Sequence, residues 1–293
     1  MNHSRRDFLA ATLGAAALSR LGAQPKKRLA TDFVTLGKSK VKVTRLAFGT
    51  GTFGGRVQRE LGQEGFTSLV RHAYDRGIRF FETAESYRGM PDMLGIALKG
   101  LPRDSYTLMM KCTTRNTGAP INTRLDDFRR QLQSEYVDIM LMHCLRPPTW
   151  ETDYRPIQDA LSEAKSKKVI LSHGASVHGL PALRTIPGNQ WLDVMLLRTN
   201  HNGTRMDTPD QADVDVPGNV DEVVAHARKI HTQGMGVIGM KLCGEGRFTR
   251  AEDREAAMKF VMNLGTVDSV TIGYKSPAEV DEAIDRMNRV MNS

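Results

Sequence analysis

Residues 137–143 read VDIMLMH, a run in which apolar side chains follow one another instead of alternating with polar ones. The runs DVMLLRT at 193–199 and GVIGMKL at 236–242 have the same character. Strands that are apolar on both faces are typical of a parallel sheet that helices cover on either side. These three runs therefore predict an α/β fold built on buried parallel strands.

Outward from these runs, short apolar segments alternate with amphipathic segments of helical period, from 65–76 to a last helix at 277–291 with Ser276 as its N-cap. The predicted strands are 45–48, 79–83, 106–112, 137–144, 169–174, 193–199, 236–243 and 269–273. A hairpin at 33–43 precedes them. Eight successive strand–helix units predict a closed (β/α)8 TIM barrel with an N-terminal β-hairpin, and a doubly wound open sheet is the alternative.

The first residues have a composition of their own. Arg5 and Arg6 stand next to each other, Phe8 and Leu9 follow, and an Ala/Leu/Gly run continues to about residue 18. This pattern predicts a twin-arginine export signal and linker at 1–30, before a single barrel domain at 31–293. We therefore expect a periplasmic protein that the twin-arginine machinery exports already folded, with retention by an uncleaved signal as the alternative.

Charge and hydropathy narrow the range of partners. The run after the arginine pair is shorter than the ~20 apolar residues that a spanning helix needs, and we expect no stable membrane span. The chain carries a formal net charge of +8, and residues 1–28 hold six lysines and arginines against one aspartate. Most of the excess therefore belongs to the signal, and the body does not have the charge of a nucleic-acid-binding protein.

Three cysteines, Cys112, Cys144 and Cys243, show neither a disulfide framework nor metal-ligand spacing. We expect three small buried residues and no metal site. Strand alternation predicts that Cys112 and Cys144 point away from the barrel mouth, into the layer between strands and helices.

Functional residues of a (β/α)8 barrel lie at the C-terminal ends of its strands. Glu82 and Tyr87 follow the second predicted strand, Lys111 ends the third and His143 ends the fourth. An ammonium group stabilises a phenolate and so makes tyrosine a better acid. A carboxylate would hold the ammonium in place, and a histidine can orient a carbonyl oxygen. The four side chains predict proton donation to a carbonyl while another group delivers hydride.

The sequence resembles the aldo-keto reductase family over residues 33–291. The matching motifs are LAFGTGTFGG (46–55), FFETAESYRG (80–89), LMMKCTT (108–114), YVDIMLMHCLRP (136–147), SHGAS (172–176), GVIGMKLCGEG (236–246) and IGYKSPAEVDEAI (272–284). The family's Asp-Tyr-Lys-His tetrad falls on Glu82, Tyr87, Lys111 and His143. The resemblance implies that Tyr87 is the general acid, Lys111 tunes it, Glu82 pairs with Lys111 and His143 orients the substrate. It implies an NAD(P)H-dependent oxidoreductase that reduces an aldehyde, ketone or sugar-like carbonyl.

The resemblance also implies an extended cofactor, NADP or NAD, across the barrel mouth. The residues that it assigns to the cofactor are Gly51, Thr52, Ser176, Met240, Lys241, Gly244, Lys275 and Ser276. Phe53 and Trp150 are expected to form walls around a small-molecule carbonyl substrate. The chain departs from the family pattern at Glu82, Val177, Leu196 and Met240, and Glu279 stands near the position expected for a basic residue that binds a 2′-phosphate.

Two other functions stay open at this point. The first is a non-catalytic or cofactor-free barrel that binds a small molecule, which the departures from the family pattern motivate. The second is an aldolase-type enzyme in which Lys111 forms a Schiff base with a carbonyl substrate.

Overall fold

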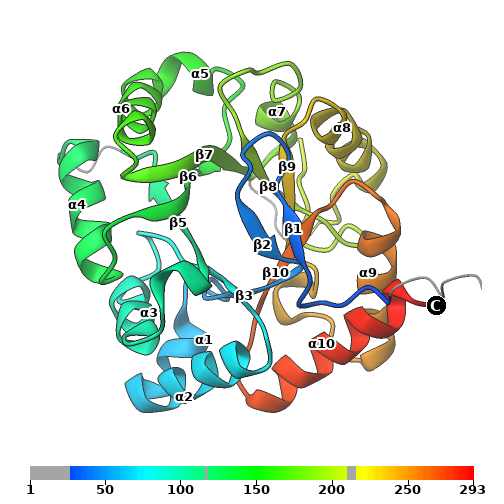
Figure 1. Ribbon diagram of the computed structural model, residues 1–293. Helices are drawn as coiled ribbons and strands as arrows, with labels where there is room; N and C mark the ends of the chain where they lie inside the picture. Colours follow the sequence, from blue (N-terminus) through cyan, green and yellow to red (C-terminus); the bar gives the residue numbers. More distant parts are fainter. Residues whose placement is uncertain (1–26, 116–117, 210–215) are drawn as a thin grey trace, which may run out of the picture.

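The computed structural model describes residues 27–115, 118–209 and 216–293. It shows eight parallel strands closed into a barrel, with helices around the outside (Figure 1). The barrel strands are β3 (Leu46–Gly49), β4 (Phe80–Glu82), β5 (Thr107–Thr113), β6 (Val137–Leu145), β7 (Ile170–Val177), β8 (Val194–Arg198), β9 (Gly236–Met240) and β10 (Ser269–Gly273). Each strand pairs with its neighbours in chain order, and β10 closes the ring on β3. The (β/α)8 barrel is confirmed, and the open-sheet alternative is wrong.

The helices follow the strands in the predicted alternation. The longer ones are α2 (Gly62–Asp75), α3 (Met90–Leu98), α4 (Ile121–Gln131), α6 (Arg155–Ser166), α8 (Val220–Thr232), α9 (Ala251–Asn263) and α10 (Pro277–Met291). Short turns of helix are α1 (Arg56–Arg59), α5 (Trp150–Asp153) and α7 (Leu180–Leu183). Ser276 caps α10 by accepting a hydrogen bond from the backbone N–H of Glu279, as its type and place predict.

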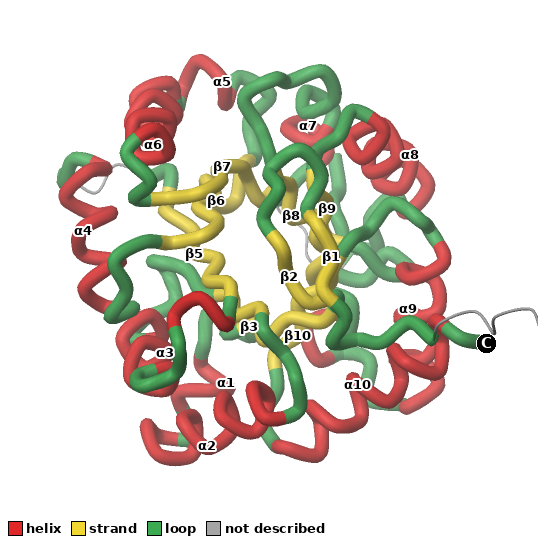
Figure 2. The backbone as a smooth tube through the Cα atoms, in the orientation of Figure 1, coloured by secondary structure: helices red, strands yellow, loops and turns green. Residues whose placement is uncertain are grey.

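The expected hairpin consists of β1 (Phe33–Thr35) and β2 (Lys42–Thr44), which pair antiparallel. It lies across the barrel opening in the view of Figure 2. Leu36 and Val43 are fully buried in the same cluster as Ala47 and Phe80, which belong to the barrel interior. The hairpin therefore closes the N-terminal end of the barrel and leaves the functional site to the other end.

Strand alternation divides the core into two layers. Met109, Ile139 and Leu141 pack inside the barrel, whereas Met110 and Met140 pack in the layer beneath the helices. By the same alternation Lys111 belongs to the inward set and Cys112 to the outward set. Cys112 is indeed fully buried in the outer layer, which confirms the prediction for this residue.

The expected export signal lies outside the described residues for all but its last positions. Within the part of the chain that is described, none of the helices combines the length and apolar character needed to cross a membrane.

Candidate functional site

A pocket of about 620 Å³ opens at the C-terminal ends of the strands. It runs from the ends of β4 and β5 to the space between α9 and α10. The predicted site residues that line it are Gly51, Thr52, Phe53, Glu82, Tyr87, Lys111, Met240, Lys241 and Lys275.

Glu82 and Lys111 form a buried ion pair at the base of the pocket. Glu82 ends β4 and Lys111 lies on the next strand, β5, so the barrel register brings them together. Burial holds the pKa of Lys111 well below its usual value, and the carboxylate in contact favours the ammonium form. The pairing that the sequence predicts is therefore present, although glutamate replaces the family's aspartate.

The tyrosine that acts as proton donor in the predicted chemistry stands directly above this pair. Nζ of Lys111 lies 4.8 Å from the centre of the Tyr87 ring. A Cβ at Gly51 would lie 2.6 Å from the Tyr87 hydroxyl, so this glycine leaves the space that the phenol occupies. Burial raises the pKa of Tyr87 far above its usual value, and the phenol keeps its proton until a reaction draws on it.

The fourth predicted residue, His143, packs edge-on against Tyr87 with ring centres 5.5 Å apart. Its Nδ1 atom lies 3.1 Å from Oγ of Ser86, which fixes the plane of the ring. Burial and the nearby Lys111 hold the pKa of His143 well below its usual value, so the ring is neutral. A neutral imidazole can donate one hydrogen bond without adding charge to the site.

Cys144 does not point away from the mouth, and that prediction is wrong. The register of β6 on β7 shifts between Met142 and Leu145, and Cys144 adopts a φ of 62°. Its backbone N–H donates to Oγ of Ser176 at 2.9 Å, and its Sγ lies 3.6 Å from Nε2 of His178. A bulge interrupts simple alternation, and the thiol therefore joins the groups at the mouth.

His178, which the sequence reasoning missed, also lines the pocket. It follows the end of β7, and Nδ1 of its ring lies 2.5 Å from a terminal guanidinium nitrogen of Arg198, the last residue of β8. A position just after a strand is a usable signal, but the predicted strand ends at residue 174, whereas the observed strand continues to Val177.

Ligand atoms of His143, Cys144 and His178 lie within 4.8 Å of one another and could in principle surround a metal ion. Arg198 opposes this use of His178. Because a guanidinium can only donate, Nδ1 of His178 accepts and Nε2 carries the proton of the neutral ring. Nε2 then has no lone pair for a metal. The expectation of a site without metal stays a prediction, and this contact supports it.

Opposite charges meet where the segment after β9 enters the pocket. Nζ of Lys241 lies 2.5 Å from the carboxylate of Glu245, and Nε of Arg205 lies 3.4 Å from it. Lys241 and Glu245 both have positive φ, 59° and 55°. The two left-handed residues turn this segment, and both Lys241 and Glu245 line the pocket.

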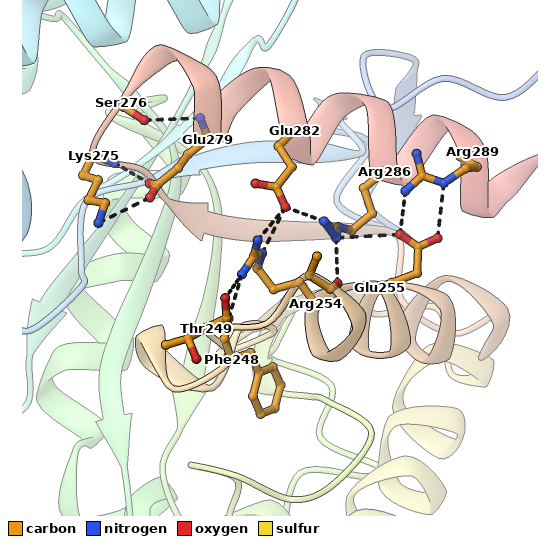
Figure 3. Close-up of polar contacts among 11 residues, drawn as sticks. Phe248, Thr249, Arg254, Glu255, Lys275, Ser276, Glu279, Glu282, Arg286 and Arg289 are labelled. Carbon is orange, nitrogen blue, oxygen red and sulfur yellow. Dashed lines mark hydrogen bonds and ion pairs between the residues drawn. The ribbon is translucent and has the colours of Figure 1, made fainter.

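At the far end of the pocket, acidic and basic side chains of α9 and α10 alternate (Figure 3). Glu279 accepts the backbone N–H of Lys275 at 2.8 Å, and its other oxygen lies 3.8 Å from Nζ of Lys275. Glu282 pairs with Arg254 at 2.9 Å and also contacts Arg286. Carboxylates therefore partner all three of these cations.

Several predicted residues lie elsewhere. Trp150, expected in a substrate wall, is fully buried beneath the surface, and its Nε1 donates to Thr185 Oγ1 at 2.9 Å. That expectation is wrong, because the indole packs in the outer core and leaves no face for a substrate. Ser176 is fully buried against the Cys144 backbone, and Ser276 is engaged as the cap of α10. Gly244 packs against Thr204 and Phe248 beside the pocket.

Comparison with known proteins gives one family match over most of the chain. The model of the aldo/keto reductase family matches residues 45–283. L-galactose dehydrogenase of Arabidopsis thaliana is 33% identical over 118 residues, which are 37% of this chain and 36% of that protein. The match therefore spans about a third of that relative's length.

Solved structures of the same family share the fold. A putative aldo-keto reductase from Pseudomonas aeruginosa superimposes with a TM-score of 0.71 at 16% identity, over 91% of this chain and 98% of that one. An aldo-keto reductase from Klebsiella pneumoniae in complex with NADPH gives a TM-score of 0.62 at 16% identity, over 91% and 90%.

Proposed function

Because the chain belongs to the aldo/keto reductase family, we propose that it reduces an aldehyde, ketone or sugar-like carbonyl with Tyr87 as the general acid. The family supports nicotinamide-dependent carbonyl reduction in general. The observation that carries the finer assignment is the convergence of Tyr87 with the Glu82–Lys111 ion pair and with His143 at one mouth.

The pocket fits an extended dinucleotide, because it reaches without a break from Tyr87 to the first turn of α10. A nicotinamide cofactor bound in this pocket would supply hydride to the carbonyl carbon. Tyr87 and His143 hold the carbonyl oxygen, and the phenol proton passes to that oxygen as the alcohol forms. The ammonium of Lys111 stabilises the phenolate left behind, and Glu82 keeps this ammonium charged and in place.

For the cofactor we propose a preference for NADH. At the end of the pocket that would hold the adenosine ribose, the lining cations Lys275, Arg254 and Arg286 are already paired with the carboxylates of Glu279 and Glu282. Glu279 already accepts the backbone N–H of Lys275, just before the N-cap of α10, which a phosphate would otherwise find free. A ribose hydroxyl can donate to a carboxylate, whereas a 2′-phosphate is repelled by it.

The test is binding and turnover with both cofactors. Purified protein is titrated with NADH and NADPH by calorimetry and by nucleotide fluorescence, and carbonyl reduction is followed at saturating cofactor. Tyr87→Phe should bind NADH as the wild type does and should reduce carbonyls at least a hundredfold more slowly. Absence of binding for both cofactors would reject the proposal in favour of a cofactor-free barrel. A borohydride-stable adduct on Lys111 would favour the aldolase-type alternative.

We also propose export through the twin-arginine machinery to the periplasm, supported by the Arg5-Arg6 pair and the apolar run after it. Fractionation of cells that express the wild type and an Arg5→Lys/Arg6→Lys variant is the test. Equal distribution of the two proteins between cytoplasm and periplasm would contradict the proposal. The size of the exported protein would distinguish a cleaved signal from a retained one.

A further inference from the structure

Three rings follow one another around the barrel mouth. Tyr87 and His143 stand edge to face with centres 5.5 Å apart, and His143 and His178 do the same at 6.0 Å. The proposed reaction uses the first two rings. His178 lines the same pocket and has no part in that reaction.

Arg198 decides which nitrogen of His178 carries the proton. The guanidinium donates to Nδ1 at 2.5 Å and cannot accept, so Nδ1 is the accepting nitrogen. Burial and the neighbouring Arg198 hold the pKa of His178 well below its usual value, so the ring is neutral. The single ring proton therefore sits on Nε2, and it stays there while Arg198 is in contact.

This fixed donor has a poor partner. Nε2 of His178 meets Sγ of Cys144 at 3.6 Å. Burial raises the pKa of the Cys144 thiol, so it stays neutral, and a neutral thiol is a weak hydrogen-bond acceptor. A hydroxyl or carbonyl oxygen of a ligand in the pocket would be a better acceptor and would take over this N–H.

We infer that His178 is a specificity-determining residue, which donates from Nε2 to a second oxygen on the carbon next to the reacting carbonyl. The inference rests on the proposed function, in which Tyr87 and His143 hold the carbonyl oxygen. Since His178 is the next ring after His143 on the same rim, it meets a substituent adjacent to the carbonyl. The favoured substrate class is 2-hydroxy aldehydes, 2-hydroxy ketones and related α-oxygenated carbonyl compounds.

Arg198 is a positioning residue that acts through His178. It is almost fully buried, and one of its terminal nitrogens lies 3.6 Å from Oδ1 of Asp207, which has no exposed surface. The contact with Asp207 holds the guanidinium of Arg198 against Nδ1 of His178. The N–H of His178 is thereby kept on Nε2, on the opposite side of the ring.

The test compares two aldehydes that differ in one hydroxyl, lactaldehyde (2-hydroxypropanal) and propanal, under saturating NADH. The quantity measured is the ratio of their kcat/KM values. In His178→Phe this ratio should fall at least tenfold from the wild-type ratio. Comparison of enzyme variants removes the intrinsic difference in reactivity between the two aldehydes. His178→Gln keeps an N–H donor and should keep the ratio within threefold.

Two further variants keep the test decisive. His173→Phe changes a histidine within β7, which stacks on Trp191 away from the pocket, and should leave the ratio unchanged. If His178→Phe does not fold, His178→Asn withdraws the donor by shortening the side chain and should give the same fall. An equal loss for both aldehydes, or no change in the ratio, would overturn the inference.

The role of Arg198 has its own readout. Arg198→Met should lower the lactaldehyde/propanal ratio of kcat/KM. Arg198→Lys can still donate to Nδ1 and should keep most of the wild-type ratio. Equal ratios in the two variants would overturn this role. Failure of the proposed function is distinguishable, because then neither aldehyde is reduced with either cofactor. If propanal is reduced and the ratio does not depend on residue 178, only the inference about His178 fails.

Discussion

Gly49 lies directly against the carboxylate of Glu82. A Cβ at position 49 would stand 2.9 Å from Oε2 of Glu82 and 2.5 Å from Oγ1 of Thr271. The two residues are register partners on β3 and β4. The missing side chain of the glycine thus provides the space that the longer acidic side chain occupies on its way to Lys111.

Gly49→Ala should therefore disturb the ion pair at the base of the pocket. The added methyl group forces Glu82 aside, and overpacking of this kind costs roughly 1–3 kcal/mol of stability. We expect a lower Tm and at least a tenfold lower kcat, measured by thermal melting and by carbonyl reduction. Gly65→Ala is the matched control, because Gly65 lies exposed within α2 and alanine favours a helix by about 1 kcal/mol.

Glu82→Asp tests the same relationship from the other side. Alone, it should lower kcat, because the shorter side chain draws the carboxylate away from Lys111. Combined with Gly49→Ala, it should recover much of the lost Tm, since aspartate leaves room for the methyl group. A double-mutant cycle measures this coupling. Simple additivity of the two stability losses would show that the residues do not share one space.

Glu279→Gln should shift the cofactor preference toward NADPH. The amide still accepts the backbone N–H of Lys275 but carries no charge against a 2′-phosphate. Removing the repulsion between this partly exposed carboxylate and a 2′-phosphate should improve the free energy of NADPH binding by about 1 kcal/mol. The NADPH/NADH ratio of kcat/KM should therefore rise about fivefold. Glu163→Gln removes an equal charge, one that pairs with Lys167 on α6 away from the pocket, and should leave the ratio unchanged. An equal rise in both variants would point to a general charge effect.

His173 should make the fold sensitive to acid. Burial lowers the pKa of His173 from 6.5 to about 4 in the folded protein. Since the folded pKa is below the unfolded one, the stabilisation is complete above pH 6.5 and is lost as the pH falls toward 4, by up to about 3 kcal/mol. His173→Phe can keep the stacking on Trp191, whose ring centre lies 4.2 Å away. Urea unfolding of both proteins at pH 4.5 and 7.5 should show a smaller pH dependence for the variant; parallel curves would contradict this assignment.

Trp150 should matter for stability alone. Trp150→Phe leaves the hydroxyl of Thr185 without its indole donor and opens a small cavity in the outer core. The expected loss is about 1–3 kcal/mol, visible in the urea midpoint. The KM values for carbonyl substrates should stay within twofold of the wild type. A large rise in KM with unchanged stability would restore Trp150 to the substrate wall.

Much of this architecture can be predicted from the sequence because the burial of a strand or helix is visible in the pattern of its own residues. The apolar runs of β6, β8 and β9 reflect strands covered on both faces, and Ser276 before Pro277 marks the start of α10. Once the barrel is assumed, the strand-end rule brings Glu82, Lys111 and His143 together without any knowledge of their distances.

The errors have equally local causes. The bulge after Met142 reverses the direction expected for the Cys144 side chain, and the sequence of that stretch contains no signal for a bulge. Trp150 lies in a polar loop sequence but turns inward, where it packs in the outer core and its N–H donates to Thr185, far along the chain. Such contacts depend on tertiary structure, which periodicity within one segment does not report.

The pairing of β3 with β10 also has a consequence for how the chain folds. Leu46 of β3 finds its partner, Val270, only after the last of the eight barrel strands has been synthesised. Until then a nascent chain on the ribosome carries an unpaired edge on its first barrel strand, which is a template for aggregation. The ring can close only once β10 is present, and until then that edge of β3 stays open to pairing with other strands.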